Sequence, residues 1–295
     1  MIETYQNIPV YHVGSNGSYS QINAERLFAT TRGIEFVPQR TFDDIADALA
    51  ENSRALAVLP IENNSSGRVH EVSDILFERR LIVVGANWLR IPMHLIGVEG
   101  ASEETAQIVV SQNQALKQSK IYIDSMDLKR KRYDSTSEAA QFVAAENDPR
   151  VVCLGGLTLA REAGLQVIRE HVANKGENNK TKFYVVRGRQ GDEVPEIPKP
   201  NGDDLMVTMV VGLKDRKGSL GHFLVELEDS DLRTTVSNPD PEDDGSHPDE
   251  GDHLFWIDFQ AASLDVRRLL EIARNRSHTF DLLGVYKLGE DQFAE

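Results

Sequence analysis

The sequence predicts an α/β protein that ends in a separate domain of βαββαβ order. Three observations support this fold class: apolar runs of strand length alternate with helical segments, turns rich in Gly and Ser separate them, and the composition changes at residues 187–204. The chain has 295 residues, more than one hydrophobic core usually organises. Hydrophobic residues make up 40% of it and charged residues 27%, as in ordinary globular proteins. We therefore expect several compact units.

Strand, turn and helix alternate through the first part of the chain. Short apolar strands are expected at residues 8–13, 34–37, 55–61 and 81–84. The first is followed by a Gly- and Ser-rich turn and a helix that ends near Gly33. A second helix begins at Thr41, with Asp44 at the spacing of a capping box. A third helix carries Val72 and Leu76 on one face, so the strands are expected to pack against helices.

A second set of strand and helix units is expected at residues 92–172. Its strands are placed at residues 94–98, 108–111 and 151–154. The clearest helix covers residues 135–145, where the hydroxyl of Ser135 precedes good helix formers. After the polar stretch 174–180, one more strand is expected at residues 181–186.

The composition of residues 187–204 predicts a linker, because Gly and charged residues surround Pro195, Pro198 and Pro200. Beyond it, strands are expected at residues 205–213, 232–237, 254–259 and 280–287, and helices at residues 218–227 and 264–275. An acidic loop separates the second of these strands from the third. This order is that of a ferredoxin-like domain.

Charge and cysteine content limit the partners and the compartment. The net charge of -15 argues against nucleic acid or an anionic membrane as a general partner, because binding phosphate needs clustered Lys and Arg. An anionic small ligand therefore needs a locally positive pocket. Cys153 is the single cysteine, so no internal disulfide is possible, and a buried thiol in a reducing cytoplasm is expected. No leader-like start or membrane-spanning apolar run is present in the sequence, so we expect a cytoplasmic protein.

Motifs of several cofactor and metal enzymes are missing from the sequence. It contains no phosphate-binding G-x-x-x-x-G-K-[ST] loop, no G-x-S-x-G nucleophile elbow and no H-E-x-x-H zinc helix. Residues 240–251 begin like a calcium-binding loop, but Gly251 stands where the bidentate Glu belongs. A solvated acidic loop is the better interpretation. We expect neither a metal nor a cofactor.

Turns at residues 14–20, 63–67 and 135–137 place hydroxyls, amides and free backbone N–H groups where a strand gives way to a helix. A helix N-terminus offers unpaired donors and a favourable dipole to a carboxylate. Residues of the same types also cap ordinary helices, and for any single turn capping is the better explanation. Three such turns together favour a site for an anionic ligand.

Six segments, following one another in order, carry a family resemblance. They are residues 14–20 (GSNGSYS), 59–67 (LPIENNSSG), 110–116 (VSQNQAL), 135–139 (STSEA), 164–167 (GLQV) and 179–183 (NKTKF). They resemble the G-P-x-G-S/T-Y/F-S, V-P-I-E-N-S-x-x-G, S-H-P-Q-A-L, S-T-x-x-A, Y-G-L-x-V-L and N-x-T-R-F segments of prephenate dehydratases. The C-terminal domain resembles the ACT domain that binds phenylalanine in this family. Together these matches cover nearly the whole chain, and the P-I-E-N and T-x-F elements are highly diagnostic.

The resemblance implies two α/β lobes like those of periplasmic binding proteins, with the substrate in the cleft between them. The implied units are a catalytic domain at residues 1–188 (first lobe 8–88 and 181–188, second lobe 89–180), a linker at 189–204 and an ACT domain at 205–290. The implied activity is the conversion of prephenate to phenylpyruvate in phenylalanine biosynthesis. It needs no cofactor, and a homodimer or homotetramer is expected.

The matching positions imply the site residues. Thr181 would be the catalytic residue, a hydrogen-bond donor or relay at the leaving oxygen. Substrate contacts are expected from the polar turns and the T-K-F strand: Ser18, Tyr19, Ser20, Asn63, Ser65, Ser135, Thr136, Ser137, Lys182 and Phe183. Lys182 stands where the family has Arg, which keeps the charge but loses the planar fork. The alternation of a strand equally allows Lys182 to point outward. Arg68 is expected to be solvated on the following helix.

The ACT-like domain retains part of the family's effector site. Effector contacts would come from Gly218, Ser219, Leu220, Ser237 and Asn238. The Gly-x-Leu turn is kept, but residues 236–239 (VSNP) replace the family's E-S-R-P segment. Loss of the charged pair predicts weak or no regulation by phenylalanine, unless the acidic stretch at residues 240–252 supplies replacement contacts.

Three functions remain open from sequence. The leading one is an aromatising prephenate dehydratase, with the amino analogue arogenate as an alternative substrate. The second is a prephenate decarboxylase that does not aromatise, against which the retained Thr181 and P-I-E-N element argue. The third is a non-catalytic, ligand-binding regulatory protein of the same fold. Analysis of the products distinguishes all three.

Overall fold

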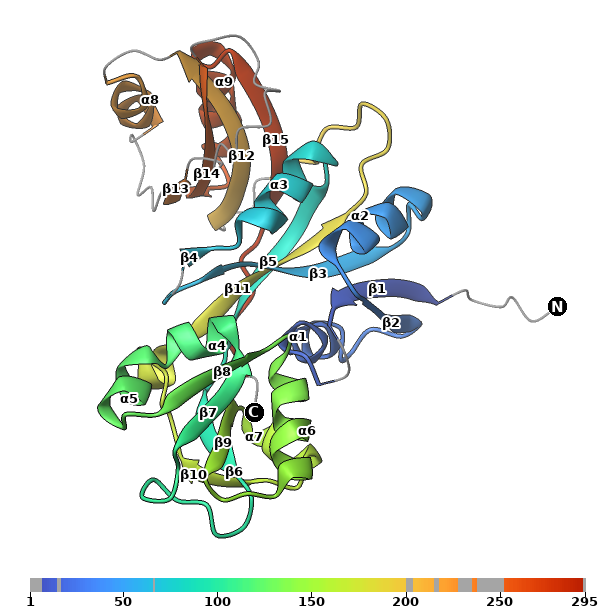
Figure 1. Ribbon diagram of the computed structural model, residues 1–295. Helices are drawn as coiled ribbons and strands as arrows, with labels where there is room; N and C mark the ends of the chain where they lie inside the picture. The colour runs from blue at the N-terminus through green and yellow to red at the C-terminus, as the bar shows by residue number, and fades with distance from the viewer. Residues whose placement is uncertain are drawn as a thin grey trace, which may run out of the picture.

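The computed structural model describes residues 7–14, 17–65, 67–199, 204–214, 218–227, 235–237 and 252–293. These residues form a 7-stranded, a 5-stranded and a 4-stranded sheet. The three sheets lie in a row, with the 7-stranded sheet in the middle, and helices pack on each of them (Figure 1). The predicted α/β class is confirmed.

The 7-stranded sheet forms the first lobe. Its strands are β1 (Ile8–Val13), β2 (Ile34–Gln39), β3 (Leu56–Asn63), β4 (Gly67–Arg68), β5 (Ile82–Arg90), β11 (Lys180–Arg187) and β16 (Gln292–Phe293). Their order is β16-β5-β11-β3-β1-β2, with β4 paired to β3. Helix α1 (Tyr19–Leu27) packs on one face, and α2 (Phe42–Glu51) and α3 (His70–Glu78) pack on the other. The predicted cap of α2 is present, since the Thr41 hydroxyl accepts from the Asp44 amide at 3.0 Å.

The 5-stranded sheet forms the second lobe. Its strands are β6 (His94–Gly97), β7 (Ile108–Gln112), β8 (Lys129–Tyr133), β9 (Val151–Gly155) and β10 (Gln166–Arg169), in the order β10-β6-β9-β7-β8. The helices between them are α4 (Asn113–Gln118), α5 (Lys120–Ser125), α6 (Thr136–Glu146) and α7 (Leu157–Glu162). Cys153 is buried in β9, and burial raises the pKa of its thiol.

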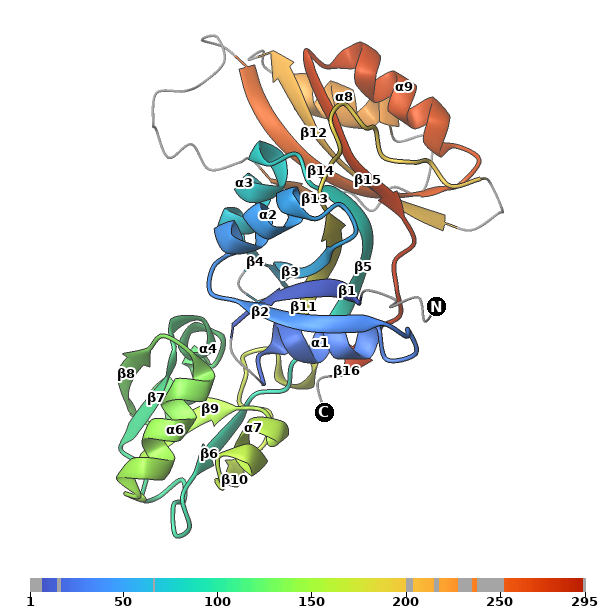
Figure 2. The same cartoon turned by 90° about the vertical axis from the view of Figure 1, so that its right-hand side faces the viewer.

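The 4-stranded antiparallel sheet forms the C-terminal unit. Its elements are β12 (Asp204–Lys214), α8 (Ser219–Leu227), β13 (Thr235–Ser237), β14 (Asp252–Ala262), α9 (Val266–Arg276) and β15 (Thr279–Tyr286). The sheet order β13-β14-β12-β15 is that of a ferredoxin-like fold. Helices α8 and α9 cover one face (Figure 2). From the other face Met206, Trp256 and Tyr286 enter the same apolar cluster as α2 and α3, so the C-terminal sheet and the first lobe share a core.

The chain crosses between the two lobes twice, after β5 and before β11. The two crossing segments are bonded to each other. The Ile91 amide donates to the Asn179 carbonyl at 2.9 Å, and the Asn179 side-chain nitrogen donates to the Ile91 carbonyl at 2.8 Å. A 3₁₀ turn, η1 (Gly176–Asn178), precedes the second crossing. We refer to this pair of crossing segments as the hinge.

Several elements were not predicted from sequence. Strand β8 consists of four basic residues and a Tyr, and its four basic side chains are exposed, so it lacks the apolar period of a half-buried strand. Helices α4, α5 and α7 have 6 residues each, too few to show a helical period. Strand β16 has 2 residues and pairs with β5, distant in sequence. Arg68, expected to be solvated on a helix, instead lies in β4 with a buried side chain.

Candidate active site

The carboxyl ends of parallel strands carry the polar turns of both lobes. In the first lobe, β1 and β3 are parallel neighbours, and each is followed by one of the predicted turns. In the second lobe, β7, β8 and β9 are parallel and lead into α4, α6 and α7. Ligands of open α/β sheets bind outside the carboxyl ends of the strands. The two edges are therefore the natural borders of a binding cleft.

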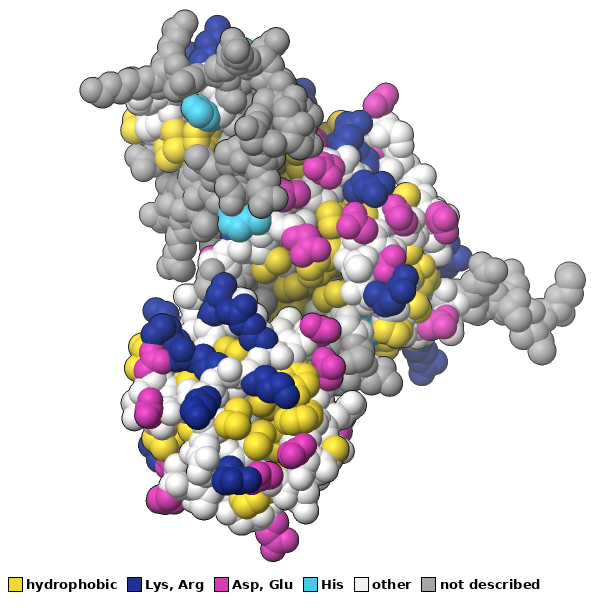
Figure 3. All heavy atoms as spheres, in the orientation of Figure 1, with side chains coloured by type: hydrophobic (Ala, Val, Ile, Leu, Met, Phe, Trp, Pro, Cys, Tyr) yellow, Lys and Arg dark blue, Asp and Glu magenta, His cyan; other side chains and the backbone are white. Residues whose placement is uncertain are grey.

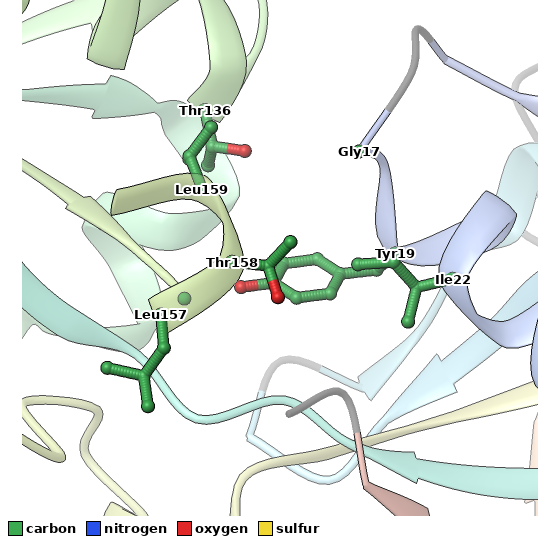
Figure 4. Close-up of a pocket in the computed structure, with 8 residues that line it drawn as sticks. Gly17, Tyr19, Ile22, Thr136, Leu157, Thr158 and Leu159 are labelled. Atoms are coloured by element: carbon green, nitrogen blue, oxygen red, sulfur yellow. The ribbon is translucent and has the colours of Figure 1, made fainter. Parts of the chain in front are cut away.

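A pocket of about 310 Å³, which includes space open to solvent, lies between the lobes at these edges (Figure 4). The first lobe lines it with Gly17, Tyr19 and Ile22, and the second with Thr136, Gly156, Leu157, Thr158 and Leu159. The side chain of Tyr19 extends from the first lobe toward the helix of the second lobe that carries Leu157 and Thr158 (Figure 4). Hydroxyl groups and helix starts thus surround the pocket from both sides.

The first-lobe wall is held by the cap of α1. The Ser18 hydroxyl accepts from the Gln21 amide at 3.3 Å and donates to the Val13 carbonyl at 3.1 Å, which ties the turn to β1. Ser20 is buried. Of the three predicted contacts in this turn, Tyr19 is the one that lines the pocket. Ser18 caps the helix that carries Tyr19.

The second-lobe wall has the same construction at α6. The Ser135 hydroxyl accepts from the Glu138 amide at 3.0 Å, and the Glu138 carboxylate accepts from the Asp134 amide at 3.2 Å. Thr136 lines the pocket, whereas Ser137 is half-buried beside it in sequence and is not part of the lining. Ser135 therefore acts as the cap that presents Thr136.

Thr181 is the second residue of the return strand β11 and is bonded to the end of β3. The Asn63 side-chain nitrogen lies 3.1 Å from the Thr181 hydroxyl oxygen and 3.2 Å from the side-chain oxygen of Asn179. All three residues are buried, with Thr181 8% exposed. Because the Thr181 oxygen accepts from Asn63, its own hydrogen remains the group that can donate to a ligand. The sequence predicted Thr181 and Asn63 as site residues, and the structure brings them together at the hinge.

Ser65 and Phe183 flank this pair in different ways. The Ser65 amide donates to the side-chain oxygen of Asn63 at 2.8 Å. The Ser65 hydroxyl is buried and has no hydrogen-bond partner within the part of the chain that the structure describes. Such a buried polar atom is a candidate contact for a polar ligand. Phe183 is 1% exposed and packs with Val10 in the apolar cluster under α1, where it supports the strand.

Lys182 points to the opposite face of β11 from Phe183, toward the C-terminal unit. Its ammonium nitrogen lies 3.7 Å from a carboxylate oxygen of Asp258, and the same oxygen lies 3.2 Å from Arg68. Burial alone would lower the pKa of Lys182, but the neighbouring Tyr184, Asp258 and Glu62 raise it in net above its ordinary value. Lys182 therefore carries its charge inside the interface between β11 and β14.

Asp258 is the centre of a buried polar cluster. The Tyr184 hydroxyl donates to its carboxylate at 2.8 Å, and the Thr208 hydroxyl donates at 2.6 Å. Tyr286 is 2.8 Å from Thr208, to which it donates because the Thr208 hydrogen is already used. Burial and the charge of Asp258 raise the pKa of the Tyr184 hydroxyl, which stays protonated.

Positive side chains gather on the second lobe although the whole chain has a net charge of -15 (Figure 3). Four consecutive ones belong to β8, and all four are exposed. Strand β8 leads directly into α6, whose first residue borders the pocket. The local potential beside the pocket is therefore more favourable to an anion than the net charge suggests.

The predicted effector residues lie in the C-terminal unit, away from this pocket. Gly218 has a φ of +86°, as a helix-preceding turn requires of glycine, and α8 begins at the next residue with Ser219 and Leu220. The backbone of Ser237 ends β13. Asn238 lies outside the described residues, so its part in an effector site stays a prediction.

Several residues of the site and its surroundings were not singled out from sequence, among them Thr158, Leu157 and Asn179. Thr158 and Leu157 begin α7, a helix too short to be recognised, although the preceding glycines are a turn signal. Asn179 was part of the N-x-T-x-F match, and that motif was the available signal for it.

Among the described residues no group of three His, Cys, Asp or Glu side chains could hold a metal ion. No helix of the described chain is long and apolar enough to cross a bilayer.

Comparison with known proteins gives a family match over most of this chain. The sequence model described as prephenate dehydratase matches residues 10–191. Arogenate dehydratase 2 of Petunia hybrida is 29% identical to this chain over 88% of its residues. The aligned part covers 66% of the length of that relative. Prephenate dehydratase of Methanocaldococcus jannaschii is 29% identical, with 80% of this chain and 82% of that protein covered.

Solved structures share the whole fold. GqqA, titled a novel type of quorum quenching acylase, has a TM-score of 0.74 at 23% identity and covers 95% of this chain and 98% of its own. A prephenate dehydratase from Arthrobacter aurescens, solved in complex with L-Phe, has a TM-score of 0.73 at 19% identity, with 95% and 89% covered. At these identities the likeness shows the fold alone.

Proposed function

The chain belongs to the prephenate dehydratase family, and from this premise we propose that it converts prephenate to phenylpyruvate. The observation that carries the proposal is the bond from Asn63 to Thr181 at the hinge between the lobes. It leaves one hydroxyl hydrogen available as a donor, in the motif position that the family resemblance assigns to the catalytic residue. Family membership and this geometry together favour a lyase.

To catalyse this reaction, the protein has to orient the substrate and supply one hydrogen-bond donor to the leaving oxygen. The bond from the ring to its carboxylate breaks, carbon dioxide leaves, and the electron pair enters the ring. The carbon–oxygen bond across the ring then breaks, and the leaving hydroxide takes up a proton to become water. The products are phenylpyruvate, carbon dioxide and water. The reaction involves no net oxidation, so its balance requires no redox partner.

Thr181 would donate a hydrogen bond to the leaving oxygen and stabilise the charge that develops there. A preorganised donor aimed at developing charge acts mainly on the transition state. Asn63 holds the Thr181 oxygen, and the contact from Asn179 to Asn63 ties this arrangement to the second crossing segment. Ser65, with its buried hydroxyl, would contact a polar group of the substrate.

The pyruvyl carboxylate would be bound at the polar helix starts of the pocket. Tyr19 and Thr136 line it, and the cap residues Ser18 and Ser135 hold the backbone of α1 and α6 in place behind them. Lys182 stays a predicted carboxylate contact, but its pairing with Asp258 argues for a different role. The scissile carboxylate should remain without a strong cation, because such pairing would stabilise the ground state.

Arogenate is the second candidate substrate, because an arogenate dehydratase is as similar to this chain, at 29% identity, as a prephenate dehydratase is. It differs from prephenate by an amino group in place of the keto oxygen. The expected assembly is a homodimer or homotetramer formed through the C-terminal unit, which we interpret as an ACT domain with an amino-acid effector. The complex of a structural relative with L-Phe supports that class of effector. We place the reaction in the cytoplasm, with which a single buried cysteine is compatible.

Product analysis tests the proposed function. The purified protein is incubated with prephenate and, separately, with arogenate, in buffer containing a metal chelator and no nucleotide. Phenylpyruvate from prephenate supports the proposal, and phenylalanine formed faster from arogenate would assign the second substrate. A nonaromatic keto acid as the sole product, or no consumption of either compound, would contradict it.

A further inference from the structure

Both lysines next to Thr181 in sequence are paired with aspartates that follow the linker. Lys182 lies 3.7 Å from a carboxylate oxygen of Asp258, and Lys180 lies 3.5 Å from one of Asp291. Asp258 belongs to β14 of the C-terminal unit, and Asp291 to the segment that follows β15. The strand that carries Thr181 is thus held on each side of this residue by the last part of the chain.

The Asp258 contact is buried and has many partners. The side chain of Asp258 is 4% exposed and that of Lys182 is 6% exposed. Tyr184, two residues further along β11, donates to the same carboxylate at 2.8 Å. Lys182 and Tyr184 thus lie on the same face of β11, and both contact the Asp258 side chain of β14. These two contacts limit how far the strand can shift or rotate next to Thr181.

The Asp291 contact is at the hinge. After β15 the chain returns to the first lobe, where the Gly289 amide donates to the Ala86 carbonyl at 2.7 Å and β16 pairs with β5 (Figure 2). Asp291 lies 3.8 Å from Arg90, the last residue of β5, as well as 3.5 Å from Lys180. One carboxylate thereby joins the end of β5, where the first crossing leaves, to the start of β11, where the second arrives.

We infer that Asp258 and Asp291 are positioning residues for Thr181, a role that rests on the proposed function of Thr181. They act through Lys182 and Lys180, respectively, and hold the start of β11, which carries the Thr181 hydroxyl. The C-terminal unit is then part of the catalytic architecture, because it sets the placement of the donor. Small displacements of a catalytic group are costly: about 1 Å can lower the rate on the order of 100-fold.

An ordinary structural role makes a different prediction from a positioning role. Ion pairs that only stabilise the fold would change the midpoint of unfolding and leave the kinetics of the folded fraction unchanged. A positioning role lowers kcat with little change in KM, since the residues that line the pocket lie on or beside α1, α6 and α7 and not on β11. Asp291→Glu restores the carboxylate one methylene further from the backbone and should recover most of the lost kcat.

The experiment compares Asp291→Asn, Asp291→Glu and Asp258→Asn with the wild-type protein in the prephenate assay. Asp291 is about a third exposed, so its variants should fold even where Asp258→Asn does not. Asp204→Asn is the matched control, because Asp204 is an exposed aspartate of the same unit that bonds to Gln260 at 3.0 Å. Thr181→Ala is measured in parallel, and circular dichroism verifies folding.

We expect kcat of Asp291→Asn to fall about tenfold with KM within about twofold, and Asp291→Glu to recover most of the loss. Asp204→Asn should behave as wild type. Unchanged kcat in folded Asp291→Asn, together with a large loss in Thr181→Ala, would overturn the positioning role and leave the proposed function intact. A wild-type protein that does not consume prephenate, or a fully active Thr181→Ala, would instead overturn the proposed function.

Discussion

The side-chain nitrogen of Asn63 lies 3.1 Å from the hydroxyl oxygen of Thr181, although the two residues are 118 positions apart in the chain. The same nitrogen lies 3.2 Å from the side-chain oxygen of Asn179. The side-chain nitrogen of Asn179 in turn donates to the carbonyl of Ile91 in the other crossing segment. Two carboxamides, those of Asn63 and Asn179, thus connect the candidate catalytic hydroxyl to both segments of the hinge.

Replacement of Thr181 by Ala should preserve the fold and lower kcat by roughly 100-fold or more, because the donor to the leaving oxygen is lost. Thr181→Ser keeps the hydroxyl and should retain much of the activity. Steady-state formation of phenylpyruvate measures both. Thr105→Ala, which removes an exposed threonine of the second lobe, is the control. Full turnover by Thr181→Ala would remove Thr181 from the mechanism.

Replacement of Gly17 by Ala should weaken substrate binding and cost about 1–2 kcal/mol of stability, because Gly17 has a φ of +80°. Its added Cβ would also lie 3.0 Å from the Glu162 carboxylate of the second lobe, so the approach of the lobes is disturbed. Gly100→Ala is the matched control, since Gly100 has a φ of +84° and its Cβ would meet nothing within 4 Å. KM should rise in Gly17→Ala and stay unchanged in Gly100→Ala. An equal rise in both variants would show that the contact between position 17 and Glu162 does not affect substrate binding.

Replacement of Lys182 by Arg should be tolerated, with catalytic efficiency within about threefold of wild type, because a guanidinium keeps the charge that faces Asp258. Lys182→Met removes this charge and should lower kcat more than it raises KM. Kinetics on prephenate and thermal unfolding of both variants measure these effects. A rise in KM as the main consequence of Lys182→Met would identify Lys182 as a direct carboxylate contact, and a large loss in Lys182→Arg would show that an ammonium is required.

His12 should make the protein less stable in mild acid. It is 1% exposed, and burial lowers its pKa below 6.5, an effect only partly offset by the Val13 backbone and by Glu25. Between the lowered pKa and 6.5 the unfolded chain binds more protons than the folded one, so the free energy of unfolding falls as the pH falls through this window. His12→Phe should lose less stability than wild type when urea unfolding is compared at about pH 7.5 and about pH 5.5. The control is His278→Phe, at an exposed histidine, and an identical pH dependence of wild type and His12→Phe would contradict the prediction.

Phenylalanine should bind weakly and inhibit little. Residues 236–239 (VSNP) stand where the resemblance implies an E-S-R-P segment, whose charged pair would supply charge-assisted contacts worth roughly 1.5–3 kcal/mol each. Without that pair we expect the affinity to be lower by tenfold or more. Calorimetric titration with phenylalanine, together with the activity assay at increasing effector, measures the effect. Micromolar binding with strong inhibition would contradict this interpretation and point to replacement contacts.

Local sequence signals were sufficient for the order of the main elements and for the helix starts at the cleft. The hydroxyls of Thr41 and Ser135 cap helices as expected, because a cap bonds to amides within three residues and depends on nothing distant. The turn after β3 and the N-x-T-x-F strand marked Asn63 and Thr181 as site residues. Strand β8 was missed, because an exposed edge strand buries no apolar face that could leave a period in the sequence.

The tertiary structure decided what the side chains of β11 meet. Strand alternation places Lys182 and Thr181 on opposite faces, but it does not reveal which face packs against another unit. That depends on the docking of the C-terminal sheet, which brings Asp258 within 3.7 Å of Lys182 and buries Arg68 beside them. Such contacts join residues far apart in sequence, and their partners follow from the packing of a shared core around Trp256 and Tyr286. Sequence alone thus identified the family and the candidate hydroxyl of Thr181, and packing between units determined which side chains surround the strand that carries it.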